Sequence, residues 1–289
     1  MSYEFMKLDR TNENLRKSFN ELAVKTFGLD FEDWYQNGYW KENYLPYVCV
    51  KDDKVVANVS VSPMGFELSG KQVKLIQLGT VMTEENERNQ GLIRKIMEKI
   101  EKDYQDKADG IFLFANDEVV NFYPKFGFEA GKEYLYSKTV QITETKSTVM
   151  VPMDKKEHWN KLEDIMKKSI CQSSMEQKNG AELVMFYVTK FMQENVFYIE
   201  SQNAYVIAEV DGEVLDLQQV FAEKEIDLDE IISAFGEEIK KVTLGFSPLE
   251  TKGWEVSELK EEDTTLFVKG KIFDEFEKEA VRFPALSHA

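Results

Sequence analysis

Residues Leu78–Met97 read LGTVMTEENERNQGLIRKIM. This stretch joins an apolar extended segment to an amphipathic helix through a short polar turn that contains Arg88 and Gly91. The first turn of a helix has backbone N–H groups without intrahelical partners, and these groups lie at the positive end of the helix macrodipole. Such a helix start binds anions. The stretch therefore predicts a strand, a turn and a helix that form a seat for a pyrophosphate.

The residues at this helix start do not supply an anion themselves. They are basic or uncharged: Arg88, Asn89, Gln90, Gly91, Leu92, Ile93, Arg94 and Lys95. Gly91 has no Cβ, so the backbone can take an unusual conformation and a ligand can approach closely. The alternative is an ordinary surface turn with solvated basic side chains, because Glu84, Glu85 and Glu87 offset the positive field. This segment alone leaves both interpretations open.

The same segment resembles the acyl-CoA-binding motif of the GNAT superfamily of N-acetyltransferases. In that motif, Arg or Gln, two residues, Gly, one residue and then Gly or Ala follow a strand. Arg88, Gly91 and Ile93 occupy these places, and Ile93 departs from the pattern because it is bulkier than Gly or Ala. The segment Gly110–Glu129, GIFLFANDEVVNFYPKFGFE, resembles the superfamily's next motif. Its matching residues are Asn116, Tyr123, Gly127 and Phe128.

The resemblance implies a role for each matching residue. The backbone N–H groups of Val81, Met82 and Thr83 would lie against the acetyl carbonyl and the pantetheine arm of acetyl-CoA. Tyr123 would lie beside the CoA sulfur as general acid, since a phenol with a pKa near 10 is protonated at neutral pH. Its structural alternative is an aromatic residue packed under a short helix. The remaining implied cofactor-binding residues are Arg88, Asn89, Gln90, Gly91, Leu92, Ile93 and Asn116, with no metal.

Hydrophobic periodicity predicts alternating strands and helices in the first half. Three antiparallel strands are expected from Tyr47 onward, then a helix from Leu92 to about Tyr104 and a buried strand over Ile111–Ala115. Asn116 is expected to cap a short helix that ends at Gly127. Further predicted elements are a strand over residues 4–8 and a helix carrying Leu15, Phe19, Leu22 and Phe27. The aromatic segment Trp34–Tyr44 is expected to supply core residues or walls of an acceptor pocket.

The second half repeats this order of elements. Helical patterns cover His158 to Ile170 and Glu182 to Met192, Asp211 and Gly212 predict a hairpin turn, and Asp227 predicts a helix cap. The turn before that last helix, FAEKEIDLDE, has five acidic residues, which would repel a pyrophosphate. This turn also lacks the motif of an Arg followed, after any two residues, by a Gly. The second half therefore resembles a degenerate GNAT repeat without a CoA site.

The predicted fold is α/β (α+β), with two tandem GNAT-like domains that each contain a mixed, mostly antiparallel sheet flanked by helices. Residues 1–145 are expected to form the catalytic acetyl-CoA-binding domain and residues 146–289 the degenerate domain. This arrangement distantly resembles the enhanced-intracellular-survival aminoglycoside acetyltransferases, which carry a further domain for which this chain has no length. The two cysteines, Cys49 and Cys171, are expected to be small buried hydrophobes rather than a disulfide or a zinc site.

Composition narrows the class of partner. The formal net charge of −17 argues against a nucleic-acid-binding surface and is compatible with a cationic substrate, or with solubility alone. Neither an export signal nor a membrane-spanning run is recognised, so a cytoplasmic location is expected. The sequence leaves the oligomeric state open, and a homo-oligomer is compatible with it.

The resemblance implies an N-acetyltransferase that moves an acetyl group from acetyl-CoA to a primary amine of a small molecule. The general base stays open between the terminal carboxylate of Ala289, His288 and a water, because the apolar tail RFPALSHA is expected to dock. An acyl-CoA-binding regulatory or scaffold protein is the alternative of another class, against which Tyr123 argues. A dinucleotide-binding domain fits less well, since its turn needs three spaced glycines.

Overall fold

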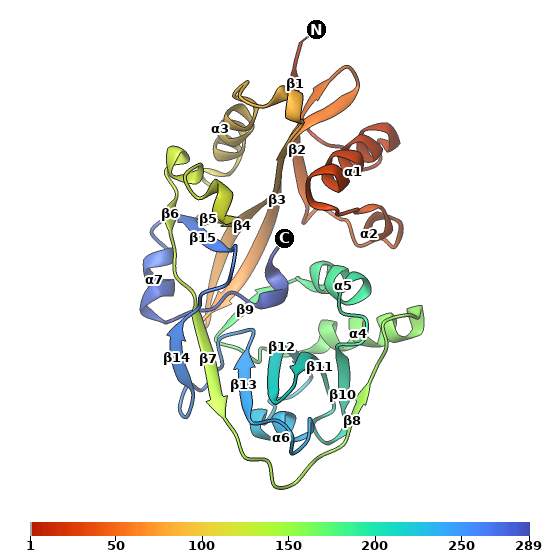
Figure 1. Ribbon diagram of the computed structural model, residues 1–289, viewed down its shortest axis with the longest axis vertical. Coiled ribbons are helices and arrows are strands. Elements are labelled where there is room, and N and C mark those ends of the chain that lie inside the picture. The colour runs from red at the N-terminus through yellow and green to blue at the C-terminus, as the bar shows by residue number, and fades with distance from the viewer. Residues whose placement is uncertain (1) are drawn as a thin grey trace.

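The computed structural model describes residues 2–289, which form two β-sheets with helices packed around them (Figure 1). The first sheet fills the upper part of the view and the second sheet the lower part. Both sheets are mixed and mostly antiparallel, and helices flank each of them. The predicted α/β fold class is therefore confirmed.

The first sheet contains the predicted antiparallel strands. Within residues 2–289 its order is β1-β2-β3-β4-β5-β15-β6, and β9 pairs with β3. Strands β1 to β4 pair antiparallel, whereas β4 and β5 pair in parallel. The strand bounds are β1 Glu4–Lys7, β2 Leu45–Lys51, β3 Lys54–Leu68, β4 Lys71–Thr83, β5 Gly110–Ala115, β6 Glu129–Ala130, β9 Met175–Lys178 and β15 Thr265–Lys269.

Helices cover the two faces of the first sheet. On one face lie α1 (Glu13–Phe27) and α2 (Glu32–Gln36), and on the other lies α3 (Leu92–Tyr104), as Figure 1 shows. The predicted apolar stripe of α3 packs on the sheet, because Leu92, Ile96 and Ile100 are all buried in one cluster with strand residues. The sheet is thus enclosed on both sides, as its apolar strands require.

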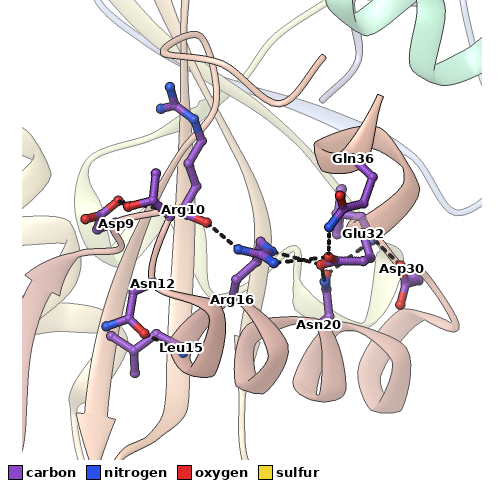
Figure 2. A network of polar contacts seen from close by, with 11 residues as sticks. Asp9, Arg10, Asn12, Leu15, Arg16, Asn20, Asp30, Glu32 and Gln36 are labelled. Atoms are coloured by element: carbon purple, nitrogen blue, oxygen red, sulfur yellow. Dashed lines mark hydrogen bonds and ion pairs between the residues drawn. The ribbon is translucent and has the colours of Figure 1, made fainter. Parts of the chain in front are cut away.

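A buried ion pair joins α1 to α2 (Figure 2). The Arg16 guanidinium, 6% exposed, donates two hydrogen bonds to the Glu32 carboxylate, at 2.9 Å from Nε and 3.1 Å from Nη2. Asn20 donates to the same carboxylate, and Arg16 also donates to the Arg10 carbonyl. These bonds lower the pKa of Glu32 and raise that of Arg16. The two-point geometry of the pair fixes α2 across α1 and so positions the aromatic segment that follows.

The second sheet follows the order β14-β7-β13-β12-β11-β10-β8 within the described chain. The hairpin between β11 and β12 turns at Gly212, as predicted. The strand bounds are β7 Tyr134–Thr139, β8 Thr148–Met150, β10 Val196–Ile199, β11 Ala204–Asp211, β12 Val214–Ala222, β13 Lys241–Leu244 and β14 Glu255–Glu258. The helices of this half are α4 Lys156–Lys168, α5 Ala181–Lys190, α6 Leu228–Ser233 and α7 Phe273–Lys278.

Each sheet takes a strand from the other half of the sequence. Strand β15, near the end of the chain, lies between β5 and β6 in the first sheet. Strand β7, from the first half, lies between β13 and β14 in the second sheet. The predicted boundary between residues 145 and 146 stays a prediction, and backbone pairing crosses it in both directions.

One predicted element differs from the structure. A single short helix was expected from Asn116 to Gly127, and the structure has two 3-10 turns there, η2 (Asp117–Val119) and η3 (Tyr123–Phe126). The Asn116 side chain makes no cap bond to η2. The prediction was wrong because Pro124 lies inside this segment, and a proline lacks the backbone N–H that a continuous helix needs.

Candidate active site

The centre of the first sheet opens into a fork. Strands β4 and β5 pair from Leu75 and Gly110 as far as Gln77 and Phe112, and the ladder then ends although both strands continue. The edges of β4 and β5 that face each other beyond this point are free of each other's hydrogen bonds. A fork between two parallel strands exposes backbone donors and acceptors that an extended ligand can bind.

Helix α3, the next α-helix after β4, begins without a side-chain cap. Gly91 is its N-cap residue, with φ of 72°, and no side chain accepts a hydrogen bond from the first turn. A residue with a Cβ is strained at this φ, so glycine is favoured there. No acidic residue stands in the first turn. The N–H groups at the start of α3 are therefore left for an external anion.

Ion pairs neutralise two of the three acidic residues that could offset this anion site, Glu84 and Glu87, whereas Glu85 is exposed. The Glu84 carboxylate accepts from Lys25 at 2.6 Å, and the Glu87 carboxylate accepts from Lys51 at 2.5 Å and from the Tyr3 hydroxyl at 2.6 Å. Among the described residues, no acidic side chain forms an ion pair with Arg88, Arg94 or Lys95. The local field at the turn is therefore more positive than the sequence alone indicates.

The backbone of β4 carries an irregularity immediately before the predicted acyl-binding residues Val81, Met82 and Thr83. Met82 pairs with Asn58 and Gly79 pairs with Ser60, so two residues of β4 oppose one residue of β3. Such a β-bulge bends the strand and redirects its backbone groups. Met82 is buried, whereas Val81 and Thr83 are half-buried on the way to the turn. Their contact with a ligand stays a prediction.

Tyr123 lies in the same apolar cluster as the walls of the fork. It is 5% exposed and belongs with Leu78 of β4 and Ala115 of β5 to the cluster beneath α3. Its ring packs against the rings of Phe128 and Phe267 at 6.2 Å and 5.6 Å. Burial raises the pKa of the Tyr123 phenol to about 12. The hydroxyl is therefore protonated over the whole neutral range.

Asn116 follows β5 on the other branch of the fork, and its amide is already engaged. Its Nδ2 donates to Asp263 Oδ2 at 2.8 Å, and the Asp117 N–H donates to Asp263 Oδ1 at 2.7 Å. Asp263 belongs to the loop between β14 and β15, and the sequence analysis did not single it out. A contact between Asn116 and pantetheine stays a prediction, and it would use the remaining side-chain oxygen.

The chain's last residues dock at the fork, as the apolar tail predicted. The Ala289 N–H donates to Gln77 Oε1 at 2.9 Å, and a Cβ at Gly79 would collide with the Ala289 carbonyl oxygen. The His288 ring stacks on Phe114 with centroids 3.7 Å apart. The sequence analysis had no signal for Gln77 or Phe114, because each looks like an ordinary sheet residue.

His288 is a poor base in this position. Burial, with a smaller effect of the Arg282 charge, lowers the pKa of its imidazole to about 3. An imidazole with this pKa cannot hold a proton taken from an ammonium group near pKa 10.4. Of the alternatives that the sequence left open for the base, His288 is therefore the least suited.

A small cavity lies on the α1 side of the fork. The cavity has a volume of about 20 Å³, which suits a single small group such as an amine nitrogen. The aromatic segment contributes Trp34 and Tyr44, and the second half contributes Gln177, Asn179 and Leu183. Trp34 and Tyr44 are buried core residues, so the core alternative is confirmed for them, and a role as walls of an acceptor pocket stays a prediction. Its other lining residues are Asn43, Ser62, Pro63, Met64 and Ala289.

A family model described as an acetyltransferase (GNAT) domain matches residues 6–131. These residues contain the fork, α3 and Tyr123. The chain carries a GNAT acetyltransferase domain. The match covers less than half of the chain, and it supports an acyltransferase enzyme with a GNAT domain in its first half. No curated protein matches the chain.

Solved structures share the fold over nearly the whole chain. A probable N-acyltransferase of unknown function from Enterococcus faecalis matches at 12% identity and a TM-score of 0.58, over 96% of this chain and 74% of that one. Eis1 from Mycobacterium abscessus matches at 12% identity and a TM-score of 0.55, over 92% of this chain and 73% of that one. A GCN5-related N-acetyltransferase from Kribbella flavida matches at 14% identity and a TM-score of 0.54, over 92% of this chain and 70% of that one. The tandem GNAT-like arrangement is therefore confirmed at the level of fold.

Within residues 2–289, no group of His, Cys, Asp and Glu side chains has a geometry that could hold a metal ion. In the same range, no helix is both long enough and apolar enough to cross a membrane. Cys49 and Cys171 are both free, and burial raises the pKa of each thiol to about 11.

Proposed function

We propose that this protein transfers the acetyl group of acetyl-CoA to a primary amine of a small cationic molecule in the cytoplasm. The observation that carries the proposal is the uncapped start of α3 at Gly91, in the segment that follows β4, one of the two strands of the fork. The main-chain N–H groups of Arg88 to Ile93 would bind the pyrophosphate there. The pantetheine arm would lie along β4, with the N–H groups of Val81, Met82 and Thr83 beside it and Asn116 across the fork.

In this mechanism the amine attacks the thioester directly and forms a tetrahedral intermediate. A backbone N–H of β4 would stabilise the negative charge that develops on the carbonyl oxygen. The Tyr123 hydroxyl would donate to the departing sulfur as general acid. Because its pKa of about 12 lies above that of a thiol, near 8.5, the Tyr123 hydroxyl would stabilise the departing thiolate through this hydrogen bond, and the thiolate would take its final proton from solvent.

The acceptor amine would enter from the opposite side of the fork, through the small cavity walled by Trp34 and Tyr44. Aromatic faces attract ammonium groups, and the net charge of −17 attracts cations from a distance. The amine must lose its proton before attack. The base stays open between a water and the docked tail at Ala289.

The test is an amine panel with acetyl-CoA. Polyamines, aminoglycosides, amino acids and lysine-containing peptides are added singly, and free CoA is measured with a thiol reagent while mass spectrometry detects the acetylated product. We expect at least one amine to accelerate CoA release and to gain an acetyl group. Tight binding of acetyl-CoA with no amine-dependent release would instead favour the regulatory or scaffold alternative.

A further inference from the structure

A strained residue stands at the β-bulge of β4. Thr80 has φ of 48°, and a β-branched residue rarely adopts this left-handed conformation. The bulge places Thr80 and Val81 opposite a single residue of β3. Strain of this kind persists only where surrounding contacts hold it, and it is common at functional sites. The contacts of Thr80 are therefore informative.

A chain of buried hydrogen bonds holds Thr80. The Tyr44 and Thr80 hydroxyl oxygens are 2.7 Å apart, and the Ser60 hydroxyl donates to Tyr44 at 2.9 Å. Asn58 Nδ2 donates to Ser60 Oγ at 3.0 Å and to the Thr80 carbonyl oxygen at 2.7 Å. Tyr44, Ser60 and Asn58 are buried. Thr80 is thus fixed at its side chain by Tyr44 and at its backbone by Asn58.

The directions of these bonds can be assigned by counting hydrogens. Ser60 uses its only hydroxyl hydrogen toward Tyr44, since its oxygen accepts from Asn58. Tyr44 accepts from Ser60, and its own hydrogen is then free to point to Thr80. The chain therefore runs in one direction from Asn58 to Thr80, and bonds aligned in this way strengthen one another.

The Asn58 side chain shows that this chain is not built for stability alone. Asn58 is 0% exposed, and its Oδ1 has no hydrogen-bond partner within the described residues. An unsatisfied buried oxygen destabilises a fold. An apolar side chain would avoid that cost but would leave the Thr80 carbonyl oxygen without its donor.

Tyr44 also connects the two sides of the fork. Its ring lines the small cavity on the α1 side, and its hydroxyl bonds to the residue directly before Val81. We infer that Tyr44 is a positioning residue for acyl transfer: through Thr80 it holds the β4 bulge so that the backbone N–H group of Val81 faces the acyl carbonyl. This inference rests on the proposed function, and it assigns the carbonyl's alignment to a side chain in the acceptor-pocket wall.

The experiment is a double-mutant cycle of Tyr44→Phe and Thr80→Gly. Tyr44→Phe removes one oxygen from a buried ring, and we expect kcat to fall about tenfold while KM for acetyl-CoA changes less than about twofold. Glycine adopts a positive φ without strain and has no hydroxyl for Tyr44 to hold. In the Thr80→Gly background, Tyr44→Phe should therefore lower kcat less than about twofold. Equal losses in both backgrounds would overturn the inference.

Hydrogen exchange of the segment 78–84 gives a readout that does not need activity. We expect Tyr44→Phe to speed exchange at the bulge, while Tyr198→Phe, which removes a hydroxyl bonded to Asn203 in the second sheet, leaves that segment unchanged. If Tyr44→Phe does not fold, Ser60→Ala removes the donor to Tyr44 and should also speed exchange there. Unchanged exchange in the folded variant would refute the inference. A wild-type enzyme that transfers no acetyl group would refute the proposed function instead, and the exchange result would still stand.

Discussion

Each half of the chain places a helix after a turn. The two helix starts differ in whether a carboxylate of the chain itself caps the first turn. At α3, Gly91 provides no side chain and the first turn holds no acid. At α6, the Asp227 carboxylate accepts from the N–H groups of Asp229 and Glu230, both of which are acidic themselves. One helix start is closed by its own carboxylates, and the other stays open. We therefore expect a ligand site at the turn that lacks acids and none at the turn that carries them.

The largest effect is expected from giving α3 the carboxylate that α6 has. Gly91→Asp places a negative side chain and a strained Cβ at the helix start. We expect acetyl-CoA affinity, measured by calorimetry, to fall by about 100-fold or more. Gly212→Asp is the matched control, because Gly212 also has a positive φ and open space around it, in a turn of the second sheet. Equal affinity of the two variants for acetyl-CoA would show that the start of α3 is not the anion site.

The next effect concerns the residue that has no counterpart in the second half. Tyr123→Phe removes the proposed acid, and we expect kcat to fall about 10- to 100-fold with little change in KM for acetyl-CoA. Because burial raises the pKa of Tyr123 to about 12, the group stays protonated at lower pH, and wild-type kcat should show no falling limb below about pH 11.

A matched control separates this role from packing. Tyr136→Phe removes the hydroxyl of another buried tyrosine, which lies on β7 in the second sheet. That hydroxyl donates a hydrogen bond to the Ala280 carbonyl oxygen. We expect it to lower the melting temperature and leave kcat within about twofold of wild type. If both variants lose only stability, Tyr123 is a packing residue and the acid is another group.

The smallest effect is expected at the closed helix start. Asp227→Ala removes the cap of α6, and the free energy of unfolding should fall by about 1 kcal/mol in urea titrations. Affinity for acetyl-CoA should stay unchanged, since this turn binds no cofactor in our interpretation. A measurable change in affinity would show that the second half contributes to the cofactor site after all.

Much of the fold could be predicted because the responsible signals are local. Periodicity together with Gly91 places α3 at Leu92–Tyr104, and Asp227 caps α6 as its side-chain chemistry predicts. The exchange of β7 and β15 could not be predicted. An apolar pattern indicates that a strand is buried, but it does not indicate which strand pairs with it. The wrong helix after Asn116 has a local cause, since Pro124 interrupts the segment, whereas the bond from Asn116 to Asp263, 147 residues away, could not be predicted.

The candidate site was predictable in its motif residues and not in their support. Arg88, Gly91 and Tyr123 stand out by type and spacing. Thr80, Tyr44 and Asn58 do not, because a polar residue in a strand gives no sign that its backbone is strained or that its side chain joins a buried chain of hydrogen bonds. Long-range polar contacts of this kind are visible only once the sheet is assembled.

The exchange of β7 and β15 has a consequence for how the protein is made. When the ribosome has released Gly110–Ala115, the strand that completes this side of the first sheet, Thr265–Lys269, has not yet been synthesised. The nascent first half therefore carries an unpaired strand edge beside apolar surface, and such an edge favours aggregation. The fork between β4 and β5 can take its final form only after nearly the whole chain has emerged, so we expect the second half to act as a late folding partner of the first.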